Sequence, residues 1–220
     1  APRKHLHAMR FLFTIFALLC AAPGVQAQDA GAGWPVWGRD PGGTRFSPLD
    51  QITAANVDEL ALAWEYRTGD SSKLQPGMPG SSFLATPVLH NNTLYFCSGY
   101  SRAFAVDAET GRERWVFDSE ADPSGVSTAK CRGVALWHDG HAPAGSACAS
   151  RVFMGTMDGR LVAIDADTGK ACEEFGEGGA IDLRVGLGEV VPGEMAMTSQ
   201  PVVINDSVVQ GAKILDNARM

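Results

Sequence analysis

An internal repeat constrains the fold of this chain more than any other feature of the sequence. The segments 102–115 and 160–173 superpose at an offset of 58 residues. The Asp, Thr and Gly that fall in register are Asp107 and Asp165, Thr110 and Thr168, and Gly111 and Gly169. Asp and Thr side chains can bond the backbone of a turn, and Gly supplies the positive φ that the turn needs. Each copy is therefore interpreted as a strand, a D-A-x-T-G turn and a second strand, and a period of this length favours repeated blades of four strands.

Short apolar segments around the two turns complete units of four strands. The first unit comprises 85–90, 93–98, 102–106 and 113–117, the second comprises 133–137, 150–156, 161–164 and 171–175, and a third begins with 201–204 and 207–210. The 25 Gly and 12 Pro residues exceed the usual share, which agrees with a turn-rich all-β chain and argues against a helical bundle. Before the first unit, the sequence predicts a short helix at 54–60 with Thr53 as its N-cap, followed by an isolated strand at 62–66.

These units amount to about two and a half blades, too few to close a ring. Each blade buries its faces against its neighbours, so an incomplete set would leave apolar faces in water. We therefore expect an all-β fold, a partial β-propeller in which 28–220 is the N-terminal part of a ring of about eight four-stranded blades. The end of the chain at Met220 is interpreted as a truncation.

The N-terminal segment has the pattern of a secretory signal peptide. Arg10 follows Met9 and precedes an apolar run at 11–22, and small residues occur at 25–27. The run is shorter than the roughly 20 residues that a membrane span requires. We expect residues 1–8 to lie upstream of the start, the mature chain to begin near Gln28, and the protein to be exported to the periplasm, with or without association with the inner membrane. The alternative is a buried core helix.

Four cysteines remain after the predicted cleavage. They are Cys97, Cys131, Cys148 and Cys172. An oxidising compartment would allow them to form disulfides, and four cysteines admit three complete pairings. Buried free thiols are the alternative, and the spacing is unlike that of a zinc site.

The charge of the chain limits its partners. The formal net charge is −7, which argues against a nucleic-acid partner because such a partner would require a basic stripe. No P-loop or Rossmann glycine pattern follows a predicted strand, so nucleotide binding has no support.

The A-x-D-x-x-T-G-x-x-x-W segment at 105–115 resembles the tryptophan-docking motif of the pyrroloquinoline quinone (PQQ) dehydrogenases. Further stretches resemble the membrane-bound glucose-dehydrogenase-like branch of that family, and they are 34–49, 60–70, 131–134, 158–165 and 215–217. The resemblance covers nearly all of 34–220. In that family the Trp packs between adjacent blades; here the first copy has Trp115 and the second has Glu173 in its place.

The resemblance implies a periplasmic enzyme that oxidises a hydroxyl of a sugar, polyol or other alcohol by hydride transfer to PQQ. In that family an Asp takes the hydroxyl proton, Ca²⁺ or Mg²⁺ polarises the quinone, and electrons pass to a respiratory acceptor such as ubiquinone or a cytochrome. The catalytic Asp and a PQQ-contacting Lys are expected downstream of residue 220, so we expect the 220-residue chain alone to be inactive.

The resemblance also assigns candidate site residues. Arg132 matches the arginine near PQQ, where a guanidinium can hold a carboxylate bidentately, and a salt bridge is its alternative role. Asp216 and Asn217 match a pair in the metal region, although both residue types are also common in plain turns. Thr128, a second candidate cofactor contact, stands where glucose-oxidising members have His, and Leu84 stands where many catalytic members have Glu. Both departures argue against specificity for glucose and, to a smaller extent, against cofactor binding.

Two other functions fit the same repeat. A non-catalytic propeller could serve as a protein-binding scaffold in envelope assembly, and a secreted propeller could bind carbohydrate without redox chemistry. Neither function would need Arg132 or the Asp216–Asn217 pair.

Overall fold

The computed structural model describes residues 33–73, 76–143 and 145–215 of the 220-residue chain. The chain divides into the units Ala1–Ala30 and Gly31–Met220, and the described residues belong to the second. The predicted signal peptide lies outside the described residues. Within them, no helix has both the length and the apolar character that crossing a membrane would require.

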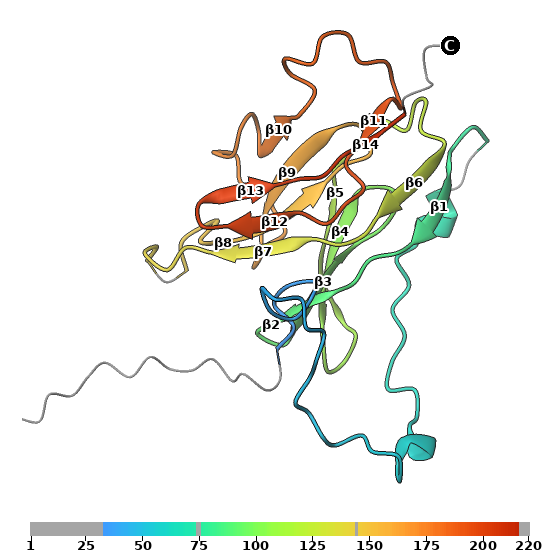
Figure 1. The fold of residues 1–220 in the computed structure, drawn as a ribbon, viewed down its shortest axis with the longest axis vertical. Coiled ribbons are helices and arrows are strands. Elements are labelled where there is room, and N and C mark those ends of the chain that lie inside the picture. Colours follow the sequence, from blue (N-terminus) through green and yellow to red (C-terminus); the bar gives the residue numbers. More distant parts are fainter. Residues whose placement is uncertain (1–32, 74–75, 144, 216–220) are drawn as a thin grey trace, which may run out of the picture. The chain divides into compact units, whose positions relative to one another are not determined.

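The first predicted unit forms a four-stranded antiparallel blade in the order β2-β3-β4-β5 (Figure 1). Its strands are β2 (Val88–His90), β3 (Thr93–Cys97), β4 (Arg102–Asp107) and β5 (Glu113–Asp118). The central pair is in direct register, with Phe96 opposite Phe104. All four predicted strands of this unit are confirmed.

The second blade contains three of its predicted strands and a different fourth one. It has the order β7-β8-β9-β10, with β7 (Ala135–His138), β8 (Ser150–Gly155), β9 (Arg160–Asp165) and β10 (Ala180–Asp182). The prediction of a strand at 171–175 is wrong. Ala171 forms only an isolated bridge to Ile164, and the chain then turns, with the Phe175 N–H bonding the Cys172 carbonyl at 2.8 Å. The Cys172 N–H still donates to the Ala163 carbonyl of β9 at 2.9 Å, but the ladder on that edge of β9 is formed by β10.

Three further pairs of strands complete the described sheets. The predicted start of a third unit is confirmed as a hairpin of β12 (Val202–Ile204) and β13 (Ser207–Val209). β1 (Gly80–Phe83) pairs in parallel with β6 (Thr128–Cys131), and β11 (Met195–Ala196) pairs with β14 (Lys213–Ile214). The fold is therefore all-β, with two complete blades and the first hairpin of another.

The segment before the first blade differs from its prediction. The expected helix at 54–60 is a single 3₁₀ turn, η1 (Val57–Glu59), with Asn56 rather than Thr53 at its N-cap position. A second 3₁₀ turn, η2 (Asp70–Lys73), precedes β1. The expected strand at 62–66 is absent as a strand, because in the described chain its backbone has no neighbouring strand with which to form a ladder.

Tryptophan docking joins successive turns of the repeat. Trp115 Nε1 donates to the Ala166 carbonyl at 2.9 Å, and its ring lies on Gly169 of the second D-A-x-T-G turn. Trp64 makes the same contacts one repeat earlier, donating to Ala108 O at 3.2 Å and covering Gly111. A Cβ atom on either glycine would lie 2.5–2.7 Å from ring carbons, so a larger residue cannot be accommodated without displacing the indole.

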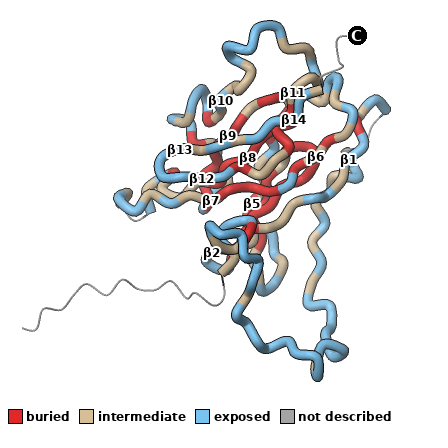
Figure 2. The backbone as a smooth tube through the Cα atoms, viewed as in Figure 1, coloured by how far each residue is buried: buried red, intermediate tan, exposed pale blue. Residues whose placement is uncertain are grey.

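The main core lies between the two blades. Tyr95 and Trp115 of the first blade pack in one cluster with Val152, Met154 and Ile164 of the second. Figure 2 shows that the buried stretches gather in the middle strands, whereas the connecting loops are exposed. Stacking of blade on blade is thus the principal source of buried apolar area, as in other repeat folds.

Candidate functional site

The segments that enter the first strands of three successive units lie side by side. They are 84–87 before β2, 132–134 before β7 and 198–201 before β12. The Thr86 N–H donates to the Arg132 carbonyl at 3.0 Å, and Gln200 Nε2 donates to the Val134 carbonyl at 2.7 Å. This arrangement brings together residues from three distant parts of the sequence, at the ends where the first strands of the units begin.

Arg132 occupies the middle of these three segments. Its side chain is exposed, and Nη1 donates to both the carbonyl and the hydroxyl oxygen of Thr198, at 3.2 and 3.0 Å. Thr198 is itself only 6% exposed, so it forms a fixed support for the guanidinium. Among the described residues, no carboxylate lies within ion-pair distance of Arg132. An anionic ligand could therefore approach the remaining nitrogens.

The residue after Arg132 allows the segments to approach this closely. Gly133 has a φ of 154°, and a Cβ atom there would lie 2.6 Å from Oε1 of Gln200. A side chain at position 133 would therefore displace the Gln200 side chain and disturb its hydrogen bond to the Val134 carbonyl.

The other predicted site residues are not brought to Arg132. Thr128 begins β6 opposite Gly80 and is half-buried. At a strand rise of about 3.3 Å per residue it lies about 10 Å along β6 from Cys131. Leu84 is exposed beside the Arg132 segment. Asp216 and Asn217 lie outside the described residues, so the metal site remains a prediction.

Two disulfides resolve the pairing that the sequence left open. Cys97 bonds Cys131 with a Cα–Cα distance of 6.0 Å, and Cys148 bonds Cys172 with a Cα–Cα distance of 5.8 Å. In the described chain, Cys148 and Cys172 lie near Glu174 in a grouping of possible metal ligands. Because its thiols form a disulfide, this group is not a metal centre.

Thr198, Gln200 and Thr86 are the supporting residues that the sequence analysis missed. Each lies just before the first strand of a unit, where Thr86 precedes Pro87 and Gln200 precedes Pro201. The sequence signal that could have identified two of them is a polar residue directly before a proline at the same place in two units. It identifies a position in the repeat, but it does not identify the contact with Arg132.

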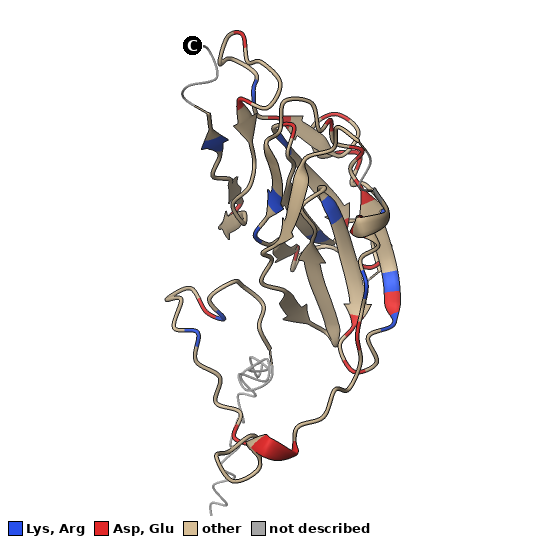
Figure 3. Ribbon diagram, turned by 90° about the vertical axis from the view of Figure 1, so that its right-hand side faces the viewer, with Lys and Arg blue, Asp and Glu red and all other residues tan. Residues whose placement is uncertain are grey.

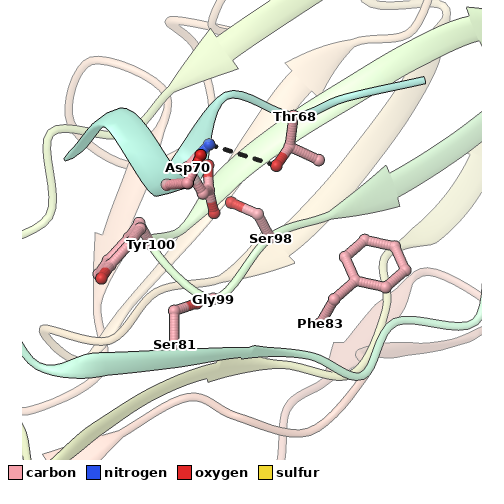
Figure 4. Close-up of a pocket in the computed structure, with 8 residues that line it drawn as sticks. Thr68, Asp70, Ser81, Phe83, Ser98, Gly99 and Tyr100 are labelled. Carbon is pink, nitrogen blue, oxygen red and sulfur yellow. Dashed lines mark hydrogen bonds between the residues drawn. The ribbon is translucent and has the colours of Figure 1, made fainter. Parts of the chain in front are cut away.

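A separate cavity of about 230 Å³ opens beside the β3–β4 turn (Figure 4). Ser81, Ser98, Thr68 and Asp70 form much of its lining, and Phe83 stands at one side. Asp70 is not free to act as a base, because it forms an ion pair of 2.9 Å with Arg102.

A larger groove of about 610 Å³ continues from this cavity across the first blade. Its apolar lining includes Trp64, Tyr66, Phe83, Leu94 and Phe96. Burial and the hydrogen bond to Glu113 raise the pKa of Tyr66, so its hydroxyl stays protonated and donates to that carboxylate at 2.6 Å. The groove thus has a mainly apolar lining, with Arg67 and Asp70 at its polar part.

Charged residues of both signs alternate along the described loops and strand ends (Figure 3). Many pair with a neighbour in sequence. Arg184 bonds Asp182 at 2.8 Å, and Arg114 bonds Asp107 at 2.8 Å. The bonds from Arg184 and Arg114 lower the pKa of each aspartate to about 2. These carboxylates are ionised and held by arginine, so they support loops rather than serve as bases.

Comparison with known proteins gives a consistent result. Residues 34–220 match the family model described as PQQ: glucose/ethanol/alcohol dehydrogenase, beta-propeller domain. The chain is 38% identical over 200 residues to the glycerol dehydrogenase large subunit of Gluconobacter oxydans, covering 90% of this chain and 27% of that protein. It is 41% identical over 195 residues to a quinoprotein glucose dehydrogenase of the same species, covering 84% of this chain and 24% of that protein.

A solved structure gives the same picture. The quinohemoprotein alcohol dehydrogenase from Comamonas testosteroni superposes with a TM-score of 0.63 at 32% identity, over 82% of this chain and 23% of that one. The chain spans about a quarter of the length of the relatives it matches.

Proposed function

Because the chain belongs to the PQQ-dependent glucose/ethanol/alcohol dehydrogenase family, we propose that it forms the first part of the propeller of an enzyme that oxidises a hydroxyl of a sugar or polyol. The observation that carries this proposal is Arg132, an exposed guanidinium held at the entry to three successive units with no carboxylate partner in the described chain. The relatives named for glycerol and glucose support the substrate class.

The residues at this place fit the cofactor that the family implies. PQQ is a tricarboxylate, and a guanidinium can hold a carboxylate through two parallel hydrogen bonds. Thr198 occupies one terminal nitrogen of Arg132 and orients the plane of the group, while the exposed side chain keeps its other donors available. Thr128 is a second proposed contact, and its position along β6 would suit the far end of a ligand larger than one carboxylate.

When bound, PQQ supplies the electrophilic carbonyl that accepts a hydride from the substrate carbon. The part of the chain described here binds and orients: Arg132 holds a carboxylate, and Thr86 and Thr198 hold Arg132. We propose that Asp216 and Asn217 supply oxygen ligands to Ca²⁺ or Mg²⁺. The base that takes the hydroxyl proton is proposed to lie beyond residue 220, so the 220-residue chain alone would not turn over.

The apolar groove on the first blade supports the proposal that the full propeller contains further blades. Trp64 and Tyr66 lie along it, and Phe83 and Leu84 are 58% and 46% exposed nearby. Blades of a propeller bury such faces against a neighbour. We propose that residues 28–220 are the N-terminal part of a propeller of about eight blades and that its last blade covers this groove.

We propose that the protein is exported to an oxidising compartment. Two disulfides suit an oxidising compartment, and the N-terminal pattern predicts a signal peptide. We propose that the enzyme acts in the periplasm and passes electrons to a respiratory acceptor, either ubiquinone or a cytochrome.

The test uses the full-length protein, loaded with PQQ and Ca²⁺ or Mg²⁺ and assayed by dye reduction with a panel of sugars and polyols. Arg132→Ala should weaken PQQ binding by about tenfold or more, because a charge-assisted bidentate contact is lost. Arg112→Ala, at an exposed turn position, is the matched control and should bind as the native protein does. Absence of both quinone binding and dye reduction would refute the proposal and favour a non-catalytic scaffold.

A further inference from the structure

The Cys97–Cys131 disulfide ends one residue before Arg132. Cys97 is the last residue of β3 in the first blade, and Cys131 is the last residue of β6. β6 does not belong to either blade, because it pairs in parallel with β1. The disulfide is therefore a covalent connection from the first blade to the strand that delivers Arg132.

Both sulfur-bearing residues are deeply buried. Cys97 and Cys131 are 0% and 2% exposed, and they pack in the cluster between the blades with Val88, Val134 and Met154. That cluster belongs to the rigid blade core, whereas the Arg132 side chain is exposed. The bond thus connects the backbone beside an exposed side chain to the buried core between the blades.

Hydrogen bonds hold the other side of Arg132. Thr86 holds its carbonyl, Thr198 holds Nη1, and Gln200 holds the carbonyl of Val134 two residues later. Thr86 and Thr198 belong to different units. On the N-terminal side of Arg132, Cys131 is the last residue of the two-stranded β1–β6 ribbon, and the disulfide connects it to β3.

From this arrangement we propose that Cys97 and Cys131 are positioning residues for the Arg132 guanidinium and set the affinity of the site for PQQ. The inference rests on the proposed role of Arg132. It goes beyond that role because it assigns the disulfide an effect on ligand affinity in addition to its effect on stability. Loss of the bond would let the end of β6 shift, and the guanidinium would no longer be held in the orientation that a carboxylate needs.

The chain contains a matched control. Cys148–Cys172 closes a loop with a sequence separation of 24 residues, compared with 34 for Cys97–Cys131, so both bonds should contribute similarly to stability. Cys148 and Cys172 pack instead with Phe153, Leu161 and Ala163 in the second blade. Their cluster reaches Ala135 but includes none of residues 132–134.

The experiment compares two double variants of the full-length protein, Cys97→Ala/Cys131→Ala and Cys148→Ala/Cys172→Ala. The first should raise the Kd for PQQ about tenfold while leaving kcat at saturating PQQ within about twofold. The second should leave the Kd unchanged although its Tm falls similarly. Equal effects of the two variants on Kd would overturn the inference, because the disulfide would then act through stability alone.

Two further measurements separate this inference from the proposed role of Arg132. If Cys97→Ala/Cys131→Ala is added to Arg132→Ala, the Kd should rise little further, whereas independent, multiplicative losses would refute positioning. If Arg132→Ala alone leaves the Kd unchanged, the proposed role of Arg132 fails. If Arg132→Ala weakens binding but the double-alanine variant does not, only the positioning role fails.

Reversible reduction covers the case in which the first variant does not fold. In the Cys148→Ala/Cys172→Ala background, dithiothreitol can reduce Cys97–Cys131 to two thiols, the dithiol giving up two electrons and two protons per bond. The reductant is removed without oxygen before PQQ is added, because it would also reduce the quinone. PQQ affinity should fall on reduction and recover on reoxidation. An affinity that does not change when mass spectrometry shows complete reduction would contradict the proposal.

Discussion

Replacement of Gly169 by alanine perturbs the tryptophan dock between the two blades. Gly169 has a φ of 72°, and an added Cβ would lie 2.7 Å from two carbons of the Trp115 ring. Trp115 is 8% exposed and donates to the Ala166 carbonyl, so the indole has little room to move away without losing that bond.

The expected loss has two parts. An L-residue in the left-handed region costs roughly 1–2 kcal/mol relative to glycine. Displacement of the indole forfeits part of the buried area and the hydrogen bond of Trp115, and complete removal of a buried aromatic ring costs about 3–5 kcal/mol. We therefore expect Gly169→Ala to lower the free energy of unfolding by about 3–5 kcal/mol in total.

Gly178→Ala is the control. Gly178 has a φ of 59° and open space around its Cβ position, so this substitution should cost only the backbone part, roughly 1–2 kcal/mol. Urea unfolding of the full-length variants, followed by tryptophan fluorescence and circular dichroism, measures both losses. Equal losses for the two variants would show that Trp115 does not depend on the absence of a side chain at position 169.

Three other predictions follow from the same contacts. Arg132→Lys should weaken PQQ binding nearly as much as Arg132→Ala, because lysine keeps the charge but not the two-pronged donor; native affinity in an equilibrium titration would contradict the carboxylate role. Hydrogen bonds from Arg114 and then Thr110 lower the pKa of Asp107 from 3.8 to about 2. Ionised Asp107 therefore stabilises the turn above about pH 4, and the stability gap between native protein and Asp107→Asn should shrink as the pH falls from 4 towards 2; a gap independent of pH would refute this. Cys148→Ala/Cys172→Ala should cost about 3–4 kcal/mol of stability, measured by calorimetry, and an unchanged Tm would show that the loop stays closed without the bond.

Much of the fold follows from local chemistry that the sequence displays. Asp107 and Asp165 accept hydrogen bonds from Thr110 and Thr168 within their own turns, at 2.9 and 2.8 Å. Because the partners are three residues apart, the D-A-x-T-G pattern was enough to place both turns, and the alternating apolar residues placed most of the strands around them. The Trp-to-turn contact also follows the repeat, which is why the family resemblance predicted it.

The candidate site depended on contacts that no local pattern encodes. Arg132 could be singled out by its motif, but the oxygens of Thr198 that hold it lie 66 residues away. The four predicted strands of the second unit looked equivalent to those of the first, yet the chain turns after Cys172 and the fourth strand is β10 at Ala180–Asp182. The segment 62–66 has the side chains of a strand, and its Trp64 docks on the first D-A-x-T-G turn, but a backbone ladder needs a partner strand.

The sequence by itself therefore determined the blade repeat and its turns, and its resemblance to the family singled out Arg132 as a candidate. Only the tertiary structure decided the disulfide pairing, the last strand of the second blade and the support of Arg132. The physical reason is the separation in sequence of the groups that interact. Hydrogen bonds within turns and the alternation of apolar residues in strands involve neighbours a few residues apart. Disulfide pairing and the contacts between segments at the ends of the blades depend on how whole blades stack.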